Sequence, residues 1–453
     1  MVLDYEIDPT EAIKVEAANP TDEPDITLQW VKEKAQTGHE LFREFRNKAE
    51  ELDDFYLNNF DFSVPENGTL IRLGTAQSVI NTLVAHVSPQ FLDISVPPPG
   101  ARGQARAELM EKFLTGAHHM VEQRTPVYRE ITKHAGLYGI AWEKIEFTAN
   151  EWSDFPEAPP HEQEASAEYR ERIKEVLDKR SVSWPIKSVA VNPQNLIWDL
   201  NNGTQPRWVI YEYQVDAEWV QAHFPEWNVY KKGYVTFQEV WTATQVGYIA
   251  DDKWVLEPRR HGYGKLPWIM YWPQMGLDTG NSEPETLYMG LLNGSIDMLR
   301  AQSQLASHYI DIVGKSAWPT LEFTGPPGIT EEVQAAWDDT PGAKNIKPPQ
   351  VNVGASQTPR PPSEIGIAKQ FLDEAIEANT VPAVARGQRP TGAASGYHTA
   401  VLAGIASLNF GAVKEAMERG LQDKGELILR IVEHVINDKL TVFGKTEAGV
   451  LDA

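Results

Sequence analysis

A thirty-residue helical pattern runs through PETLYMGLLNGSIDMLRAQSQLASHYIDIV, residues 284–313. Apolar residues recur along it with helical spacing, and polar residues occupy the other side. The spacing predicts one long amphipathic helix, which would span about 45 Å at 1.5 Å per residue. We expect its packed face to be carried by Leu292, Ile296, Leu299 and Ile310.

The residues after this helix predict a small module and a return helix. Residues 314–362 are rich in proline and turn residues, with a possible strand at 320–323 and a possible short helix at 330–337. Residues 363–380 are again helix-patterned and carry the chain back. Together these segments form an excursion from a main body.

The main body upstream, residues 28–283, is predicted to be α+β. An amphipathic helix follows Thr27, and further helices are expected at 75–87, 104–124 and 126–139. Period-2 patterns and turn signals predict strands at 91–96, 142–147, 187–191, 208–213, 235–241, 247–250, 253–256 and 268–272.

Downstream of the excursion, residues 381–396 contain two prolines and three glycines and predict a loop. Residues 397–437 are helix-patterned, but Gly404, Gly411, Gly420 and Gly425 interrupt the run. Each glycine costs about 1 kcal/mol relative to alanine, so we expect a kinked or two-piece helix. Residues 438–453 are expected to hold a return strand at 440–443.

Charge excludes one class of function. The 453 residues include 41 Lys and Arg against 64 Asp and Glu, a net charge of −23. A protein that holds nucleic acid by bulk attraction to phosphate would be basic. Residues 1–27 are the most acidic part and predict a flexible acidic tail.

Composition also excludes thiol chemistry and predicts no membrane partner. There is no cysteine, so disulfides, thiolate metal sites and cysteine nucleophiles are absent. The first residues lack the pattern of a secretory signal. The longest nearly apolar run, residues 400–413, is shorter than the ~20 residues that a bilayer-spanning helix needs.

No motif predicts catalysis, a metal or a cofactor. Gly314-Lys315-Ser316 and Gly444-Lys445-Thr446 lack the first glycine of a phosphate-binding loop. His118-His119 lacks the i, i+4 spacing of a zinc pair, and we interpret both residues as surface histidines. The serine of 392–396 is out of register with a nucleophile elbow.

One window is unusual because residues 378–414 contain no acidic residue. Within it, Arg386, Gln388 and Arg389 lie in the predicted loop, which favours a locally positive segment that meets a polyanion without holding it tightly. For residues 400–413 the alternative is a helix buried in a subunit interface, which would also exclude acids. Both interpretations stay open.

Four segments resemble portal proteins of tailed double-stranded DNA bacteriophages. They are RTPVYREITKHAGLYGIAWEKIEF (124–147), VAVNPQNLIWDL (189–200), HGYGKLPWIMYWP (261–273) and VPAVARGQRPTGAASGYHTAVL (381–402). They are similar to a helix, glycine turn and strand, to two further strands, and to a channel-lining loop and helix. The order of the segments is more specific than any one of them.

The resemblance implies a portal-like α+β fold. Residues 28–283 would be the wing, 284–313 and 363–380 the stem helices, 314–362 the clip, 381–396 the tunnel loop and 397–437 the tunnel helix. The DNA-facing loop residues would be Arg386, Gln388, Arg389, Thr391, Ser395 and His398. Portal chains usually continue into a helical crown, which here would be short or missing.

The resemblance also implies a non-enzymatic virion subunit, assembled in the host cytoplasm at one capsid vertex. About twelve copies would form a ring through which double-stranded DNA is packaged and ejected. The implied partners are the terminase large subunit, a neck or adaptor protein, and the major capsid and scaffolding proteins. The alternatives are a minor capsid or adaptor protein without a channel, and, more distantly, a hydrolase with scattered carboxylates.

Overall fold

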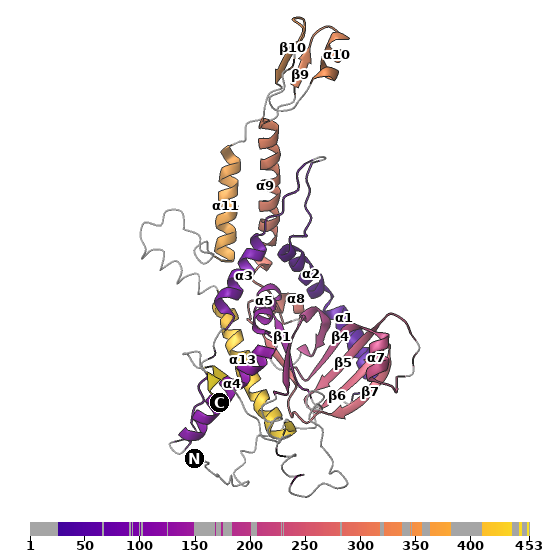
Figure 1. The fold of residues 1–453 in the computed structure, drawn as a ribbon, viewed down its shortest axis with the longest axis vertical. Coiled ribbons are helices and arrows are strands. Elements are labelled where there is room, and N and C mark those ends of the chain that lie inside the picture. Colours follow the sequence, from indigo (N-terminus) through magenta and orange to yellow (C-terminus); the bar gives the residue numbers. More distant parts are fainter. Residues whose placement is uncertain are drawn as a thin grey trace. The chain divides into compact units, whose positions relative to one another are not determined.

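The computed structural model describes most of the chain. Described are residues 26–65, 68–89, 94–98, 103–124, 126–148, 184–200, 206–227, 231–280, 283–317, 321–337, 347–355, 363–381, 410–436, 444–445 and 451–452, with a few single residues between them. The fold is mixed α+β (Figure 1). Among the described helices, none combines the length and the hydropathy that a membrane span requires.

The chain divides into two compact units. The sheet unit comprises residues 1–50, 83–291 and 407–453, and the hairpin unit comprises residues 51–82 and 292–406. The resemblance implies that residues 28–283 form one wing. Residues 51–82 instead belong with the hairpin unit.

The sheet unit contains two antiparallel sheets. The smaller sheet has the order β2-β1-β8, and the larger sheet follows the chain from β3 to β7. The strands of the smaller sheet are β1 (Ala141–Phe147), β2 (Ile186–Val191) and β8 (Trp268–Tyr271). Those of the larger sheet are β3 (Leu196–Trp198), β4 (Trp208–Asp216), β5 (Tyr234–Thr242), β6 (Gln245–Ala250) and β7 (Lys253–Arg260).

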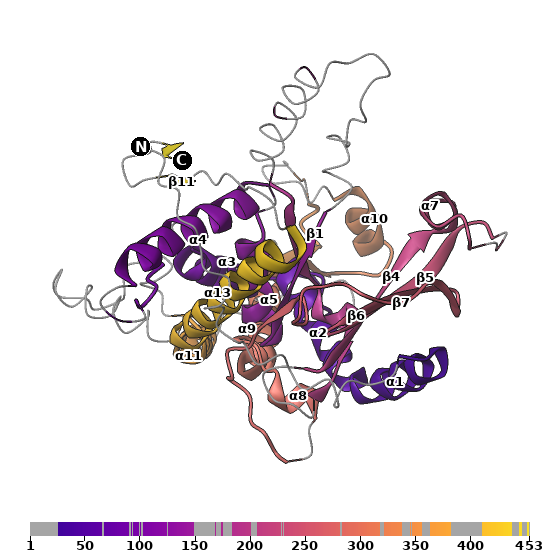
Figure 2. The same ribbon diagram turned by 90° about the horizontal axis from the view of Figure 1, so that it is seen from below.

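Three helices pack together beside the smaller sheet: α4 (Gln104–Arg124), α5 (Tyr128–Tyr138) and α13 (Gly411–Ile431) (Figure 2). α5 ends at Gly139, whose φ of 72° is the left-handed conformation that glycine adopts readily. The chain then turns directly into β1. A helix, glycine turn and strand were expected here from the sequence, and the structure confirms them.

Two helices lie on opposite faces of the larger sheet, as Figure 2 shows: α1 (Leu28–Leu41) and α7 (Ala217–His223). Side chains alternate between faces along a strand. Accordingly, Phe237 packs in the core beneath α7, and its neighbour Gln238 lines a cavity with residues of α1.

The hairpin unit is built on two helices, α9 (Ile296–Ala317) and α11 (Ser363–Asn379), which contact each other. Gln302 of α9 donates a hydrogen bond of 2.5 Å to Asp373 of α11. Between them in sequence lie β9 (Leu321–Thr324), α10 (Ile329–Ala336) and β10 (Asn352–Ala355), with β9 and β10 paired antiparallel. The expected excursion of helix, small module and return helix is present.

An extended segment, residues 69–73, runs along α9 and explains its buried serines. The amide N–H groups of Thr69, Ile71 and Leu73 donate to side chains of α9, namely Asp311 at 3.0 Å, Ser307 at 2.9 Å and Ser303 at 3.2 Å. Two residues of extended chain rise about 6.6 Å and four helical residues about 6 Å, so alternate amides match successive helical turns. We call this set the serine ladder.

The long helix begins later than we expected. Instead of one helix over 284–313, the chain forms α8 (Pro284–Leu287), a non-helical stretch and a 3-10 turn (Asn293–Ser295) before α9. The reason lies at Gly290, where a β-carbon would overlap the carbonyl of Leu137, and the N–H of Leu291 donates to Gly136. This close contact with the end of α5 is incompatible with a continuous helix.

The first amphipathic pattern contains two helices, α1 and α2 (Arg43–Leu57), which meet at Phe42. Phe42 is buried against Trp198, with their ring centroids 4.3 Å apart. The next helix, α3 (Thr75–Val87), has the bounds expected from the sequence. The prediction of a strand at 91–96 is wrong for the described residues of that range. The N–H of Val96 donates to the side chain of Glu111 on α4 rather than to a neighbouring strand.

The last long helix, which we expect to be kinked or in two pieces, begins within the described residues at Gly411, one of its four glycines. α13 is continuous through Gly420 and Gly425 and passes into a π-helical turn at Val432–Ile436. Close packing against the sheet stabilises the helix across Gly420. Beyond it, a short pair of strands, β11 (Gly444–Lys445) and β12 (Leu451–Asp452), is present. Residues 397–409 and the strand expected at 440–443 lie outside the described residues.

Candidate assembly surface

The predicted DNA-facing loop is not among the described residues. Residues 382–409 include Arg386, Gln388, Arg389, Thr391, Ser395 and His398, so the structure does not bring any of these side chains to a site. The candidate surface therefore rests on the hairpin unit.

The four residues predicted to pack the long helix have different environments. Leu292, Ile296 and Leu299 are buried, whereas Ile310 has 45% of its surface exposed. Towards the same end of α9, Tyr309 and Val313 are also exposed. Leu292 and the N-terminal part of α9 are therefore buried, whereas the C-terminal part of α9 leaves an apolar group uncovered.

α11 is apolar on two sides. Ile376 is buried, and Asp373 on the adjacent part of the helix faces α9. Ile367 precedes Ile376 by nine residues, which is two and a half helical turns, so it lies on the opposite side. Ile367 is 69% exposed and Phe371, one turn further on, is 67% exposed. We call the side that carries Ile367, Phe371 and Ala378, with Glu374 between them, the outer face of α11.

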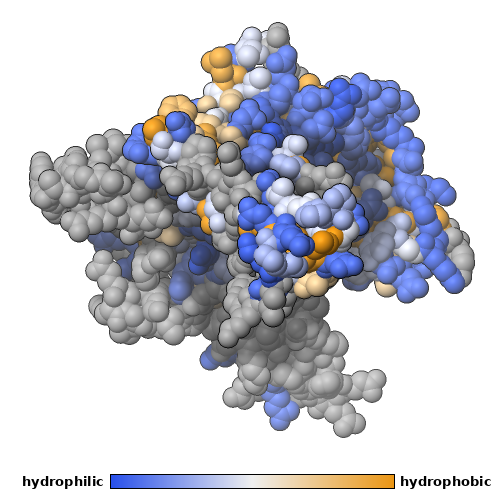
Figure 3. Space-filling view, turned by 90° about the horizontal axis from the view of Figure 1, so that it is seen from above, coloured by the Kyte–Doolittle hydropathy of each residue, from blue (hydrophilic) through white to orange (hydrophobic). Residues whose placement is uncertain are grey.

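Such a face is unusual on an isolated two-helix unit. A surface helix of a globular protein normally presents polar residues to water opposite its buried stripe. On the face of the molecule that Figure 3 shows, hydrophobic residues lie in small groups among hydrophilic ones. Fully burying a large apolar side chain contributes about 1.5–3 kcal/mol, so covering Ile367 and Phe371 would favour association. The outer face of α11 is therefore a candidate interface.

The sheet unit contains a buried ionic network that sequence reasoning missed. The Nζ of Lys424 on α13 lies 2.6 Å from Oε1 of Glu143 on β1, and neither side chain has exposed surface. The hydroxyls of Ser188 and Tyr271 also donate to the carboxylate of Glu143. Three donors thus satisfy a carboxylate that burial would otherwise destabilise.

Aromatic and imidazole groups complete the surroundings of Lys424. Its Nζ lies 4.5 Å from the ring centroid of Tyr128, whose hydroxyl is 3.0 Å from Nδ1 of His118. Burial, and then the charge of Lys424, lowers the pKa of His118 to about 3. His118 is therefore a neutral, buried residue, and our expectation of a surface histidine is wrong.

A second buried ion pair involves Lys144, the residue that follows Glu143 on β1. Lys144 is 2.6 Å from Glu239 on β5 and 2.9 Å from Glu146. Burial disfavours the charged form of Lys144, but the two carboxylates outweigh this effect and raise its pKa above the usual value. Because adjacent residues of a strand face opposite ways, Glu143 and Lys144 hold separate pairs on the two faces of β1.

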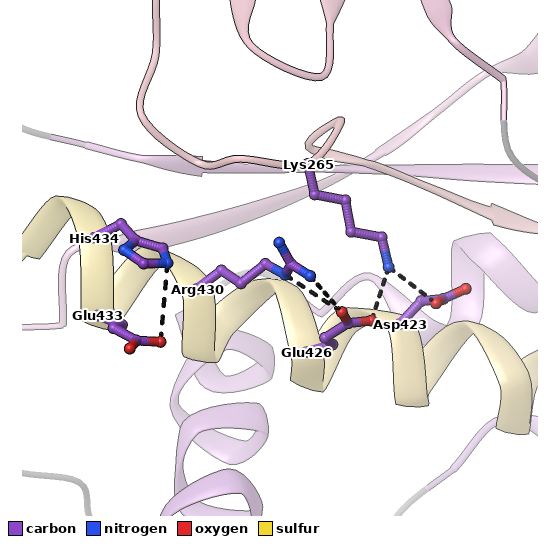
Figure 4. A network of polar contacts seen from close by, with 6 residues as sticks. All are labelled: Lys265, Asp423, Glu426, Arg430, Glu433 and His434. Carbon is purple, nitrogen blue, oxygen red and sulfur yellow. Dashed lines mark hydrogen bonds and ion pairs between the residues drawn. The ribbon is translucent and has the colours of Figure 1, made fainter. Parts of the chain in front are cut away.

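The exposed side of α13 carries a different kind of network (Figure 4). Lys265 donates to Asp423 at 3.2 Å and to Glu426 at 3.0 Å, and Arg430 donates to Glu426 at 3.0 Å. Burial acts against ionisation of Glu426, but its bonds to Lys265 and Arg430 prevail and lower its pKa. Solvent screens these pairs, so each contributes little to stability.

No feature of the described residues forms a recognisable catalytic centre. Gly314-Lys315-Ser316 lies inside α9 rather than in a loop. Among the residues that the structure describes, no group of three histidines or acids could hold a metal ion. The arrangement offers packing surfaces and buried ion pairs rather than an activated nucleophile.

Comparison with known proteins adds no relatives: no family model matches the chain, and no curated protein matches its sequence.

Proposed function

We propose that the chain is the subunit of a phage portal, a ring that encloses the DNA channel at one capsid vertex. The observation that carries the proposal is the outer face of α11, a helix side that exposes two large apolar residues, Ile367 and Phe371, opposite the buried Ile376. The order of elements supports it, since two long helices flank a small β-α-β module as in the family that the sequence resembles.

A second copy of the chain is the partner that best fits this face. Each hairpin unit exposes two apolar groups, one at Ile367 and Phe371 on α11 and one at Tyr309, Ile310 and Val313 on α9. Contact between the α11 group of one copy and the α9 group of the next is head to tail. A head-to-tail contact that closes by rotation generates a ring.

The charge of the chain fits the passage of DNA. Duplex DNA carries one phosphate charge per ~1.7 Å of its axis, and an acidic wall repels it. The net charge of −23 therefore favours sliding over tight binding.

Arg386 and Arg389 would supply the few exchangeable contacts, so replacing both with Glu should lower DNA packaging without preventing ring assembly. Unchanged packaging would show that these arginines do not face DNA.

The interface is tested with Ile367→Asp combined with Phe371→Asp. Both side chains are exposed within one copy, so the variant should still fold, with the circular dichroism spectrum of the unmodified chain, but remain monomeric in light scattering coupled to size exclusion. Leu277→Asp is the matched control, because Leu277 is equally exposed at 70% but lies in the sheet unit. Rings of normal size from the α11 variant would contradict the assignment of this interface.

A further inference from the structure

The aliphatic residues on the side of α13 that packs on the smaller sheet do not by themselves define the position of the helix along its axis. Ala416, Gly420, Lys424 and Ile428 follow one another at intervals of four residues, and all four are buried. Sliding the helix by one turn, about 5.4 Å, would bring Gly420 or Ile428 to the place of Lys424. Aliphatic and small residues alone distinguish such registers weakly.

Lys424 removes this ambiguity. In the observed register its Nζ meets Glu143, and none of the residues one turn away carries a positive charge. Every shifted register would leave the buried carboxylate of Glu143 without a cation and Lys424 without its anion. Burying an unpaired charge is strongly destabilising.

Tyr271 links the charge to the helix backbone. Its hydroxyl donates to Glu143, and its ring lies where a β-carbon of Gly420 would be. Gly420 and Lys424 are one helical turn apart. Tyr271 therefore contacts both Gly420, where no side chain fits, and the carboxylate of Glu143, which pairs with Lys424. After a one-turn shift, Ala416 or Lys424 itself would lie against the ring.

We propose that Lys424, Glu143 and Tyr271 act as a register lock that fixes the position of α13 along the smaller sheet. Lys424 and Glu143 are positioning residues in this account, and the lock does not depend on the proposed function. Buried ionic and polar groups are best attested in this role, because uncharged replacements often retain stability and lose uniqueness.

The absence of native cysteine makes the test direct. Spin labels are attached at Glu418→Cys on α13 and Lys253→Cys on β7, both exposed sites of the sheet unit, and labelled chains are diluted with unlabelled ones. Pulsed electron paramagnetic resonance then gives the distribution of distances between the two labels. The labelled protein with Glu143, Lys424 and Tyr271 unchanged should give one narrow distribution of distances between the labels.

In Glu143→Gln combined with Lys424→Met, a second population displaced by about one helical turn should appear, or the distribution should broaden to include it. The control is Lys144→Met combined with Glu239→Gln, which removes the other buried pair of β1 without touching α13 and should keep one narrow distribution. A single narrow distribution in the folded Glu143/Lys424 variant would overturn the proposal.

The exchanged pair, Glu143→Lys with Lys424→Glu, restores complementary charges. It should return the narrow distribution. If neither Glu143/Lys424 variant folds while the Lys144/Glu239 control does, the pair is required for folding itself and the register lock is refuted.

Discussion

Gly420 lies against the ring of Tyr271 so closely that no side chain fits between the helix and the strand. This contact explains why a glycine that weakens an isolated helix occurs in the middle of α13. The backbone of α13 approaches β8 there, and the hydroxyl of the same tyrosine reaches Glu143.

Gly420→Ala should therefore destabilise the protein despite the higher helix propensity of alanine. Overpacking a dense core costs about 1–3 kcal/mol, and the gain in propensity is about 1 kcal/mol. We expect a lower unfolding midpoint in denaturant. Gly411→Ala is the control, since a β-carbon at Gly411 meets no neighbouring atom and should not lower stability.

Lys424 and Lys265 both form ion pairs with carboxylates, but their environments differ. Lys424→Ala leaves Glu143 buried without its cation and should cost about 3–5 kcal/mol of unfolding free energy. Lys265→Ala removes the exposed pairs of Figure 4 and should cost less than about 1 kcal/mol. Denaturant unfolding measures both losses of unfolding free energy. Similar losses in Lys424→Ala and Lys265→Ala would contradict the expectation that burial makes the Lys424 pair the costlier one to break.

The serine ladder should depend on individual hydroxyls. Ser307→Ala leaves the N–H of Ile71 without its partner and is expected to lower the stability of the hairpin unit by about 1–3 kcal/mol. Gln304→Ala removes an exposed hydrogen bond to Ser63 and should change stability by less than about 0.5 kcal/mol. Hydrogen exchange of the Ile71 amide measures the effect locally. Unchanged protection in Ser307→Ala would disprove the ladder.

Stability should fall in mild acid because His118 is buried as a neutral residue. Its pKa is about 3 in the folded protein against about 6.5 for an unperturbed histidine, so the unfolded chain binds the extra proton between these values. The contribution of neutral His118 to the unfolding free energy is present above about pH 6.5 and is lost as the pH falls. Between about pH 7.5 and pH 5 the loss is about 2 kcal/mol.

His118→Gln removes this titration and should reduce the pH dependence of the unfolding free energy by that amount. His223→Gln is the control for the substitution itself, because His223 is exposed. His134, whose pKa burial lowers to about 4, should keep part of the slope in both variants. Equal slopes for His118→Gln and the unmodified chain would contradict the buried, neutral assignment.

The sequence predicted those elements whose period or turn chemistry is local. The helix at 363–379, the helix-glycine-strand unit around Gly139 and the antiparallel strands of the larger sheet all followed from such patterns. The start of α9 and the continuity of α13 did not, because both depend on contacts between distant segments. Gly290 meets Leu137, and Gly420 meets Tyr271.

The candidate surface was only partly predictable. Periodicity identified Leu292, Ile296 and Leu299 as apolar positions of one helix, but it could not show that Ile310 stays exposed within one copy. Lys424 offered a signal that was overlooked, since it is a lone charge in the apolar stripe between Gly420 and Ile428. Glu143 could not have been matched to it from local pattern, because the two are far apart in the chain.

Electron microscopy of the purified protein shows whether the chain forms a portal ring. We expect rings with cyclic symmetry, about twelve subunits and a central hole that admits duplex DNA, with the hairpin units of neighbouring copies in contact. A stable monomer at micromolar concentration and native salt, or a ring whose hole is too narrow for a duplex, would contradict this expectation.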